Sequence, residues 1–191
     1  MKYYLAALAA IVCAPGMAAA QTTDATPHFN GVRLEARLGY ETPTVSDSGS
    51  VFKIGSAVSY GGEAGFDLRL GHNVVAGPYA VYEFSSVKLC DGPDCISEDG
   101  NLGVGGRVGV VVSPRVLIYG KIGYARIRFT ASSGGATGSE SADGVQGAIG
   151  LNLNLGSHFY GLAEINYADY GRFEGINLQR RHVAAGIGVR F

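Results

Sequence analysis

The last residues of the chain, Arg181-His182-Val183-Ala184-Ala185-Gly186-Ile187-Gly188-Val189-Arg190-Phe191, decide the fold class. Every second residue from Val183 to Phe191 is apolar, whereas the alternate positions carry polar, charged or very small side chains. Successive side chains of a β-strand point to opposite faces. The alternation therefore predicts a strand with one apolar and one polar face.

Seven earlier stretches repeat this alternation, at residues 31–41, 60–70, 74–85, 101–112, 116–129, 145–155 and 159–168. Short polar turns at 71–73, 113–115 and 156–158 alternate with long polar segments, expected to be loops, at 42–59, 86–100, 130–142 and 171–180. An even number of strands with all long connections at one end is typical of a transmembrane barrel. The sequence thus predicts an all-β fold, an eight-stranded antiparallel up-and-down transmembrane β-barrel over residues 30–191.

Closure of this barrel requires the first strand to pair with the last, because an open edge would leave backbone groups unpaired in lipid. Pro78 interrupts the third stretch and lacks an N–H for the ladder, so we expect a β-bulge near it.

The polar row mixes glycines with long charged side chains, as in Gly103, Gly105, Arg107 and Gly109. A water-facing row gains nothing from such glycines, which weaken strands. The lumen of eight strands is barely wide enough for side chains, so each long charged group needs small neighbours. This favours charges inside and apolar residues against lipid, over a soluble barrel of opposite polarity. Tyrosines at the loop end and phenylalanines at the turn end approximate two aromatic girdles (Tyr40, Tyr60, Tyr82, Tyr124, Tyr167; Phe159, Phe191).

Six acids and six bases fall on the inward row, and their charges cancel (Glu35, Glu41, Glu63, Asp67, Glu83, Glu164; Arg33, Arg37, Arg69, Arg107, Lys121, Arg190). Unpaired charges in a low-dielectric lumen are very costly. We therefore expect a network of hydrogen bonds that fills the barrel and permits at most weak conductance. The alternative is that Glu63, Arg107 and Glu164 line a narrow ion path.

The start of the chain has the features of a signal peptide over residues 1–20: one Lys, a short apolar run and Ala18-Ala19-Ala20 before the expected cleavage point. Cys13 raises a lipoprotein alternative, but bulky Val12 precedes it. Residues 21–29 are expected to form a polar periplasmic tail. No later stretch is long and apolar enough for a transmembrane helix, and a formal net charge of −1 gives no electrostatic case for nucleic acid.

Cys90 and Cys95 flank a Gly-Pro turn within the second long segment. Export through an oxidising compartment favours a disulfide between them, with metal binding as the alternative. No cofactor or metal site is expected elsewhere. Arg126 and Arg128 share the apolar phase, which makes sense if they stand at the head-group level, where they could contact lipopolysaccharide phosphates. A further alternative is a lipid A-modifying enzyme, in which His182 would activate a serine at the outer rim.

The stretch Ala163-Glu164-Ile165-Asn166-Tyr167-Ala168-Asp169-Tyr170-Gly171, followed by the strand ending at Phe191, resembles the opacity-type porin family, small outer-membrane proteins related in architecture to OmpA and OmpX. The resemblance implies a Gram-negative outer-membrane location, periplasmic termini, exposed variable loops and a terminal Phe191 read by the barrel-assembly machinery. Some members act in adhesion, immune contact or envelope integrity. No peptidoglycan-binding domain follows the barrel.

We therefore expect a non-enzymatic structural and surface-interaction barrel in contact with outer-membrane lipid and lipopolysaccharide. The host or surface ligand is unknown. A low-conductance pore for ions or small solutes is the alternative.

Overall fold

A computed structural model describes residues 29–47, 50–53, 55–92, 94–133, 135–173 and 176–191. The expected signal peptide, residues 1–20, and most of the expected tail, residues 21–28, lie outside the described residues. No helix in the described part of the chain is long and apolar enough to cross a membrane.

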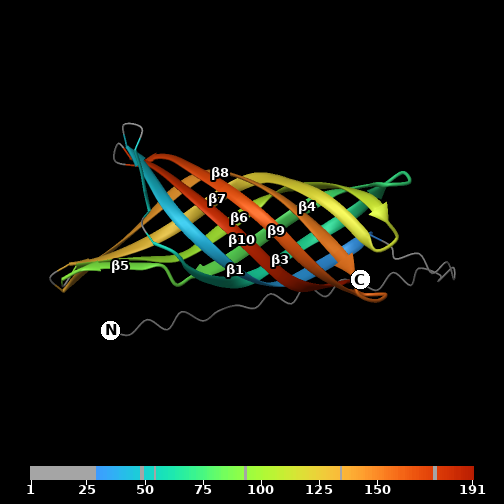
Figure 1. The fold of residues 1–191 in the computed structure, drawn as a ribbon, viewed down its shortest axis with the longest axis horizontal. Helices are drawn as coiled ribbons and strands as arrows, with labels where there is room; N and C mark the ends of the chain where they lie inside the picture. Colours follow the sequence, from blue (N-terminus) through green and yellow to red (C-terminus); the bar gives the residue numbers. More distant parts are fainter. Residues whose placement is uncertain (1–28, 48–49, 54, 93, 134, 174–175) are drawn as a thin grey trace, which may run out of the picture.

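Ten antiparallel strands follow one another along the chain (Figure 1): β1 (Gly31–Asp47), β2 (Ser50–Lys53), β3 (Ala57–Leu70), β4 (Val74–Ser85), β5 (Lys88–Asp91), β6 (Asp94–Ser113), β7 (Val116–Ser133), β8 (Ala136–Asn154), β9 (Phe159–Phe173) and β10 (Ile176–Arg190). Eight of them form the ring β1-β3-β4-β6-β7-β8-β9-β10, while β2 pairs only with β1 and β5 only with β6. The expected closure is confirmed, since β10 pairs with β1 from Arg33↔Arg190 to Ser46↔Asn177.

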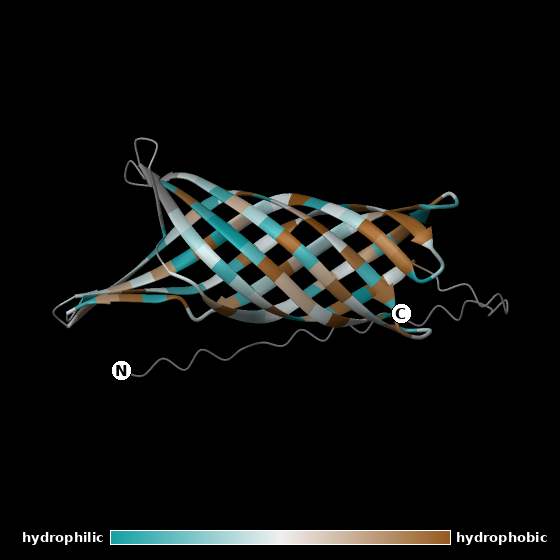
Figure 2. Ribbon diagram, viewed as in Figure 1, coloured by the Kyte–Doolittle hydropathy of each residue, from teal (hydrophilic) through white to brown (hydrophobic). Residues whose placement is uncertain are grey.

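The apolar row faces outward and the charged row faces the lumen. Leu34, Val108 and Ile187 are 47%, 58% and 66% exposed, whereas their polar neighbours Arg33, Arg107 and Arg190 are at most 6% exposed. Figure 2 shows the resulting alternation of hydrophilic and hydrophobic positions along the strands. Only a barrel whose outer wall is solvated by hydrocarbon puts so much apolar surface outside and ionised groups inside.

The two ends of the ring differ. Tight turns at residues 71–73 and 114–115 and a short connection at 155–158 close one end, which we call the turn end. The tyrosines of the expected girdle are exposed near the opposite end, which we call the hairpin end (Tyr40, Tyr60, Tyr82, Tyr124, Tyr167). Phe159 and Phe191 are exposed at the turn end. This is the arrangement predicted from the sequence.

The long segments expected to be loops are largely strands, so this expectation was wrong. β1 continues to Asp47, β6 starts at Asp94, and β7 and β8 meet across 133–136. Their serine- and glycine-rich composition predicts exposure, but an exposed hairpin can satisfy its backbone by pairing as well as a loop can with water. The hairpin end therefore carries extended ladders instead of flexible loops.

The wall splits at the hairpin end into two protruding sheets. β8 pairs with β9 only up to Val145↔Asp169, although β8 continues to pair with β7 as far as Ser133↔Ala136. One sheet comprises β5 and the outer parts of β6, β7 and β8, and projects beyond the ring at the left of Figure 1. The other comprises β2 and the outer parts of β1, β10 and β9.

The bulge expected near Pro78 is absent, because Gly65↔Tyr79 and Leu68↔Ala76 keep one register across it. Gly77 is the residue that makes this possible. A Cβ built at Gly77 would lie 1.6 Å from the carbonyl oxygen of Phe66 on β3. The two backbones approach so closely here that the chain absorbs the proline without inserting a residue.

Gly77→Ala should destabilise the barrel by about 2 kcal/mol or more, because the added methyl group meets backbone that cannot move aside. Gly106→Ala is the matched control. Gly106 of β6 pairs with Pro78 of β4, and a Cβ built at Gly106 has nothing within 4 Å. Urea unfolding in detergent micelles measures both. Equal midpoints for the two variants would contradict the close approach.

Candidate functional site

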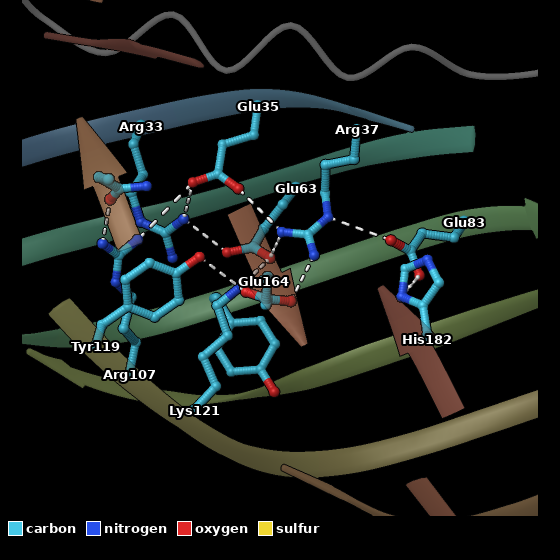
Figure 3. A network of polar contacts seen from close by, with 12 residues as sticks. Arg33, Glu35, Arg37, Glu63, Glu83, Arg107, Tyr119, Lys121, Glu164 and His182 are labelled. Atoms are coloured by element: carbon cyan, nitrogen blue, oxygen red, sulfur yellow. Dashed lines mark hydrogen bonds and ion pairs between the residues drawn. The ribbon is translucent and has the colours of Figure 1, made fainter. Parts of the chain in front are cut away.

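The lumen of the ring is built around Glu63 of β3. Its carboxylate accepts hydrogen bonds from Arg33 Nη1 at 2.6 Å, Arg37 Nη1 at 3.1 Å and Lys121 Nζ at 2.6 Å. These donors come from β1 and from β7, on the facing part of the wall, so one buried carboxylate ties together strands that do not pair (Figure 3).

Two further carboxylates extend this network across the lumen. Glu35 accepts from Arg33 Nη1 at 2.7 Å and from Arg37 Nη1 at 3.1 Å. Glu164 of β9 accepts from Arg37 Nη2 at 2.5 Å and lies 2.5 Å from Lys121 Nζ. Charge-assisted bonds of this kind are the strong ones, and here they lie away from water. Two tyrosine hydroxyls donate further hydrogen bonds to these carboxylates: Tyr160 to Glu35 and Tyr119 to Glu164, both at 2.9 Å.

Asp67 anchors the network nearest the turn end. It accepts from Arg33 Nε at 3.3 Å and from Arg190 Nη2 at 2.9 Å. Arg107 lies over the ring of Tyr119, 3.8 Å from its centroid, a cation–π contact that partly replaces lost hydration. Arg107 also donates to the side-chain oxygen of Asn152.

Phe29 seals this end, although it was expected to belong to a polar tail. It is 1% exposed and packs with Val75 and Leu117 beneath the network. The guanidinium of Arg190 lies 5.1 Å from its ring centroid. The residue that precedes the first strand by two positions is therefore part of the lumen.

A second cluster lies toward the hairpin end and centres on Arg180 of β10. Its Nε donates to Glu41 Oε2 at 2.5 Å and its Nη2 to Glu83 Oε2 at 3.1 Å. Glu83 also accepts from Arg37 Nε at 3.2 Å, which links this cluster to the network around Glu63. Arg180 was expected to lie in a loop. It is separated from Arg190 by an even number of residues along β10, so both side chains point to the same, inward face.

The structure brings eleven of the twelve predicted lumen residues into these contacts: Arg33, Glu35, Arg37, Glu41, Glu63, Asp67, Glu83, Arg107, Lys121, Glu164 and Arg190. Arg69 is the exception and corrects the prediction. It is partly exposed, and its Nε donates to the carbonyl oxygen of His72 at 3.1 Å. Lying beside a turn, Arg69 bonds the turn backbone and leaves the lumen.

Ser59, His182 and Glu83 meet in the order of a hydrolytic triad. Ser59 Oγ lies 2.9 Å from His182 Nε2, and His182 Nδ1 lies 3.5 Å from Glu83 Oε2. The second distance is too long for a hydrogen bond, and Glu83 is already held by two arginines. All three residues are buried at 4% exposure or less, so no substrate reaches the hydroxyl. The arrangement is a polar contact inside the wall.

The predicted disulfide is confirmed: Cys90 and Cys95 are bonded across the β5–β6 hairpin, with a Cα–Cα distance of 4.1 Å. Arg126 and Arg128 are exposed on β7 near the hairpin end. Arg126 already has a partner, because its Nε and Nη2 donate to Asp143 at 2.5 and 3.0 Å.

Comparison with known proteins agrees with this geometry. The family described as "Outer membrane protein beta-barrel domain" matches residues 5–191. The chain belongs to this family. It is a Gram-negative outer-membrane β-barrel of the OmpA and OmpX type, so the hairpin end is extracellular and the turn end periplasmic. A search of curated proteins found no match.

Two solved barrels illustrate the shared fold. Ail, the attachment invasion locus protein of Yersinia pestis, was solved in complex with the heparin analogue sucrose octasulfate; it is 15% identical, with 84% of this chain and 99% of that chain covered and a TM-score of 0.59. Neisserial surface protein A is 15% identical, with 83% and 97% covered and a TM-score of 0.56. At such identities the likeness concerns the fold alone.

Glu63→Ala should destabilise the barrel by about 3–5 kcal/mol, because it leaves Arg33, Arg37 and Lys121 buried without their shared partner. Glu140→Ala, which removes an exposed acid of β8, should change stability by less than about 0.5 kcal/mol. Unfolding in urea, followed by far-ultraviolet circular dichroism and by gel migration with and without boiling, measures both variants. A mild effect at Glu63 would show that water fills the lumen and screens these charges.

Proposed function

We propose that this barrel is a surface-interaction protein whose protruding sheet binds an extended segment of a partner polypeptide outside the cell. The observation that carries the proposal is the open edge of β8 over residues 136–141, before Ala142 packs against Tyr170 and Gly144 approaches the backbone of β9. Along these residues β8 pairs with β7 on one side, while β9 joins it only from Val145 onward.

This edge offers unpaired backbone donors and acceptors to an incoming strand. Proteins usually protect such an edge with proline, lysine, a bulge or a covering segment. Residues 136–144 contain no proline or lysine, and seven of the nine positions before the ring begins, 136–141 and 143, are exposed. The charged residues of the segment are two acids, Glu140 and Asp143, and Asp143 is paired with Arg126 of β7. The opposite edge of the sheet is the four-residue strand β5, which the disulfide fastens to β6 and which carries the charged residues Lys88 and Asp91.

A second copy of this chain is a poor occupant of the β8 edge. Two barrels in one membrane share an orientation, so a two-fold axis along the membrane normal would relate them. Their β8 edges would then run in the same direction with like groups facing each other, amide against amide. Strand pairing needs N–H opposite C=O. The edge therefore suits a segment of a different polypeptide.

A synthetic peptide with the sequence of residues 125–133, Ala-Arg-Ile-Arg-Phe-Thr-Ala-Ser-Ser, is a suitable probe, because these residues pair with β8 in the native register. We expect the labelled peptide to bind the detergent-solubilised barrel, measured by fluorescence anisotropy. Amides of residues 136–141 that exchange quickly in the free barrel should become protected. The same peptide with N-methyl groups on alternate residues is the control for backbone pairing.

A barrel with a shortened hairpin provides the matched variant. Thr130 and Ser139 face each other, with their hydroxyl oxygens 2.9 Å apart, so residues 131–138 can be replaced by Asn-Gly without changing the register below. This variant should keep its heat-modifiable migration and lose peptide binding. Equal binding by the variant, or by the N-methylated peptide, would refute the proposal.

The alternative of a pore has less support. The inward side chains that line the middle of the ring are held by one another at hydrogen-bonding distance, which supports a filled interior. The sealed position of Phe29 supports the same reading. An enzymatic role likewise lacks an accessible nucleophile in the described lumen. We therefore infer a non-enzymatic barrel without a wide channel.

Lipid contacts complete the proposed function. Arg128 is exposed at the level of the outer head groups and has no ion-pair partner among the described residues, so we infer that it contacts lipopolysaccharide phosphate. Phe191 is 69% exposed at the periplasmic end, with its N–H bonded to Val32 O at 2.9 Å. This supports presentation of the terminal aromatic ring to the assembly machinery.

Arg128→Ala should reduce the thermal stabilisation that added lipopolysaccharide gives the purified barrel. Arg126→Ala should reduce it less, because Asp143 already neutralises Arg126. Melting temperatures in detergent with and without lipopolysaccharide compare the two. An unchanged response in Arg128→Ala would remove this contact from the proposal.

A further inference from the structure

The ionisable groups buried in the described part of the barrel do not balance. With the buried imidazole of His182 counted as neutral, seven buried carboxylates (Glu35, Glu41, Glu63, Asp67, Glu83, Glu98, Glu164) face six buried bases (Arg33, Arg37, Arg107, Lys121, Arg180, Arg190). The additional acid is Glu98 of β6, which the sequence analysis assigned to a loop. It lies at the hairpin end, four residues beyond exposed Leu102, and exposed Ile96 follows it toward the tip of the β5–β6 hairpin.

No hydrogen bond of good geometry reaches either carboxylate oxygen of Glu98 from the described residues, although its side chain is 0% exposed. The Ser85 hydroxyl of β4 approaches the carboxylate without completing such a bond. Glu41, also fully buried, leaves its Oε1 without a partner. Both acids approach the same nitrogen, because Arg180 Nε is 2.5 Å from Glu41 Oε2 and 3.9 Å from Glu98 Oε1. Two carboxylates thus converge on one guanidinium that satisfies only one of them.

One proton supplies a partner for Glu41 Oε1 and for one oxygen of Glu98, while the other Glu98 oxygen and Arg180 Nη1 keep none among the described residues. Two ionised carboxylates that share a dry site repel each other, and one of them then retains its proton. A protonated Glu98 becomes a donor, and Glu41 Oε1 is an acceptor that lacks one. With this proton the six bases face six remaining negative charges, so the buried charge of the barrel becomes neutral.

We propose that Glu98 and Glu41 form a proton-binding site at the extracellular end of the lumen, in which Glu98 carries the proton and donates it in a hydrogen bond to Glu41. The site makes the packing of side chains at the hairpin end of the lumen depend on the pH of the medium. A metal ion fits less well, since no group of three His, Cys, Asp or Glu side chains in the described residues could hold one.

Each neighbouring strand contributes groups that bear on the proton. β1 supplies Glu41, β4 supplies Glu83 and Ser85, β9 supplies Tyr170, and β10 supplies Arg180, with His182 beyond it against Glu83. Burial and the adjacent Glu41 carboxylate raise the pKa of Glu98 to about 8, and Arg180 opposes this rise.

The sign of the effect on stability follows from the raised pKa. The unfolded chain has an ordinary glutamate, so between about pH 4.5 and pH 8 the folded barrel binds the additional proton and the unfolded chain does not. Stability therefore falls as pH rises through this range. The loss from this one group approaches about tenfold in the folding equilibrium constant per pH unit.

Infrared spectroscopy of the intact barrel tests the site directly. At pH 6 the wild type should show a protonated-carboxyl C=O band that disappears by pH 9. Glu98→Gln, which keeps the shape of the protonated acid and the ability to donate to Glu41, should lack that band. A wild-type spectrum without any protonated carboxyl at pH 6 would overturn the proposal, and this readout needs no variant.

Stability measurements provide the second readout. Between pH 5 and pH 8 the melting temperature of the wild type should fall more than that of Glu98→Gln, while Glu140→Gln, an exposed acid on β8, should follow the wild type. Parallel curves for wild type and Glu98→Gln would overturn the proposal. So would a melting temperature that responds to calcium or magnesium and not to pH, because a metal ion would then supply the missing charge.

Discussion

The narrowness of an eight-stranded lumen is the constraint on which the rest of this structure depends. Eight strands leave room for side chains and little else, so every ionised group inside must find its counter-charge among its neighbours. Glu63 of β3 meets this requirement by accepting from two arginines of the adjacent strand β1 and from Lys121 of β7, across the lumen. The glycines of the same row serve the same end: a Cβ at Gly65 would lie 2.5 Å from the guanidinium of Arg33.

Strand periodicity explains how much could be predicted from the sequence. Ring size, closure and the inward phase of Arg33, Arg107 and Arg190 follow from alternation, because side-chain direction in a strand depends only on parity. Arg180 was missed because its segment was taken for a loop, where parity has no meaning. Glu98 would have been missed even in a strand, because a β-bulge between Glu98 and Gly100 shifts the phase of β6, whose inward residues in the ring, such as Arg107, are odd-numbered. Phe29 was missed because nothing local distinguishes an aromatic residue in a tail from one that folds back under a barrel.

The membrane-embedded ring and the protruding sheets are stabilised by different interactions. Within the membrane the outer wall needs only apolar side chains, and the lumen needs charge balance. Beyond the ring both faces of the sheet formed by β5 and the outer parts of β6, β7 and β8 carry exposed side chains. The apolar cluster of Ile127, Ala142, Tyr170 and Leu178 joins the bases of the two sheets. Stability there depends on backbone pairing and on this cluster, which leaves the sequence of the sheet edges free to serve recognition.

The seam between the first and last strands has an unexpected composition. Arg33 and Arg190 face each other across it, and like charges at such a position repel. Asp67, which belongs to neither strand, accepts from both. The contact that offsets the repulsion across the seam therefore belongs to a third strand, so that closure of the ring and charge balance in its interior depend on the same carboxylate.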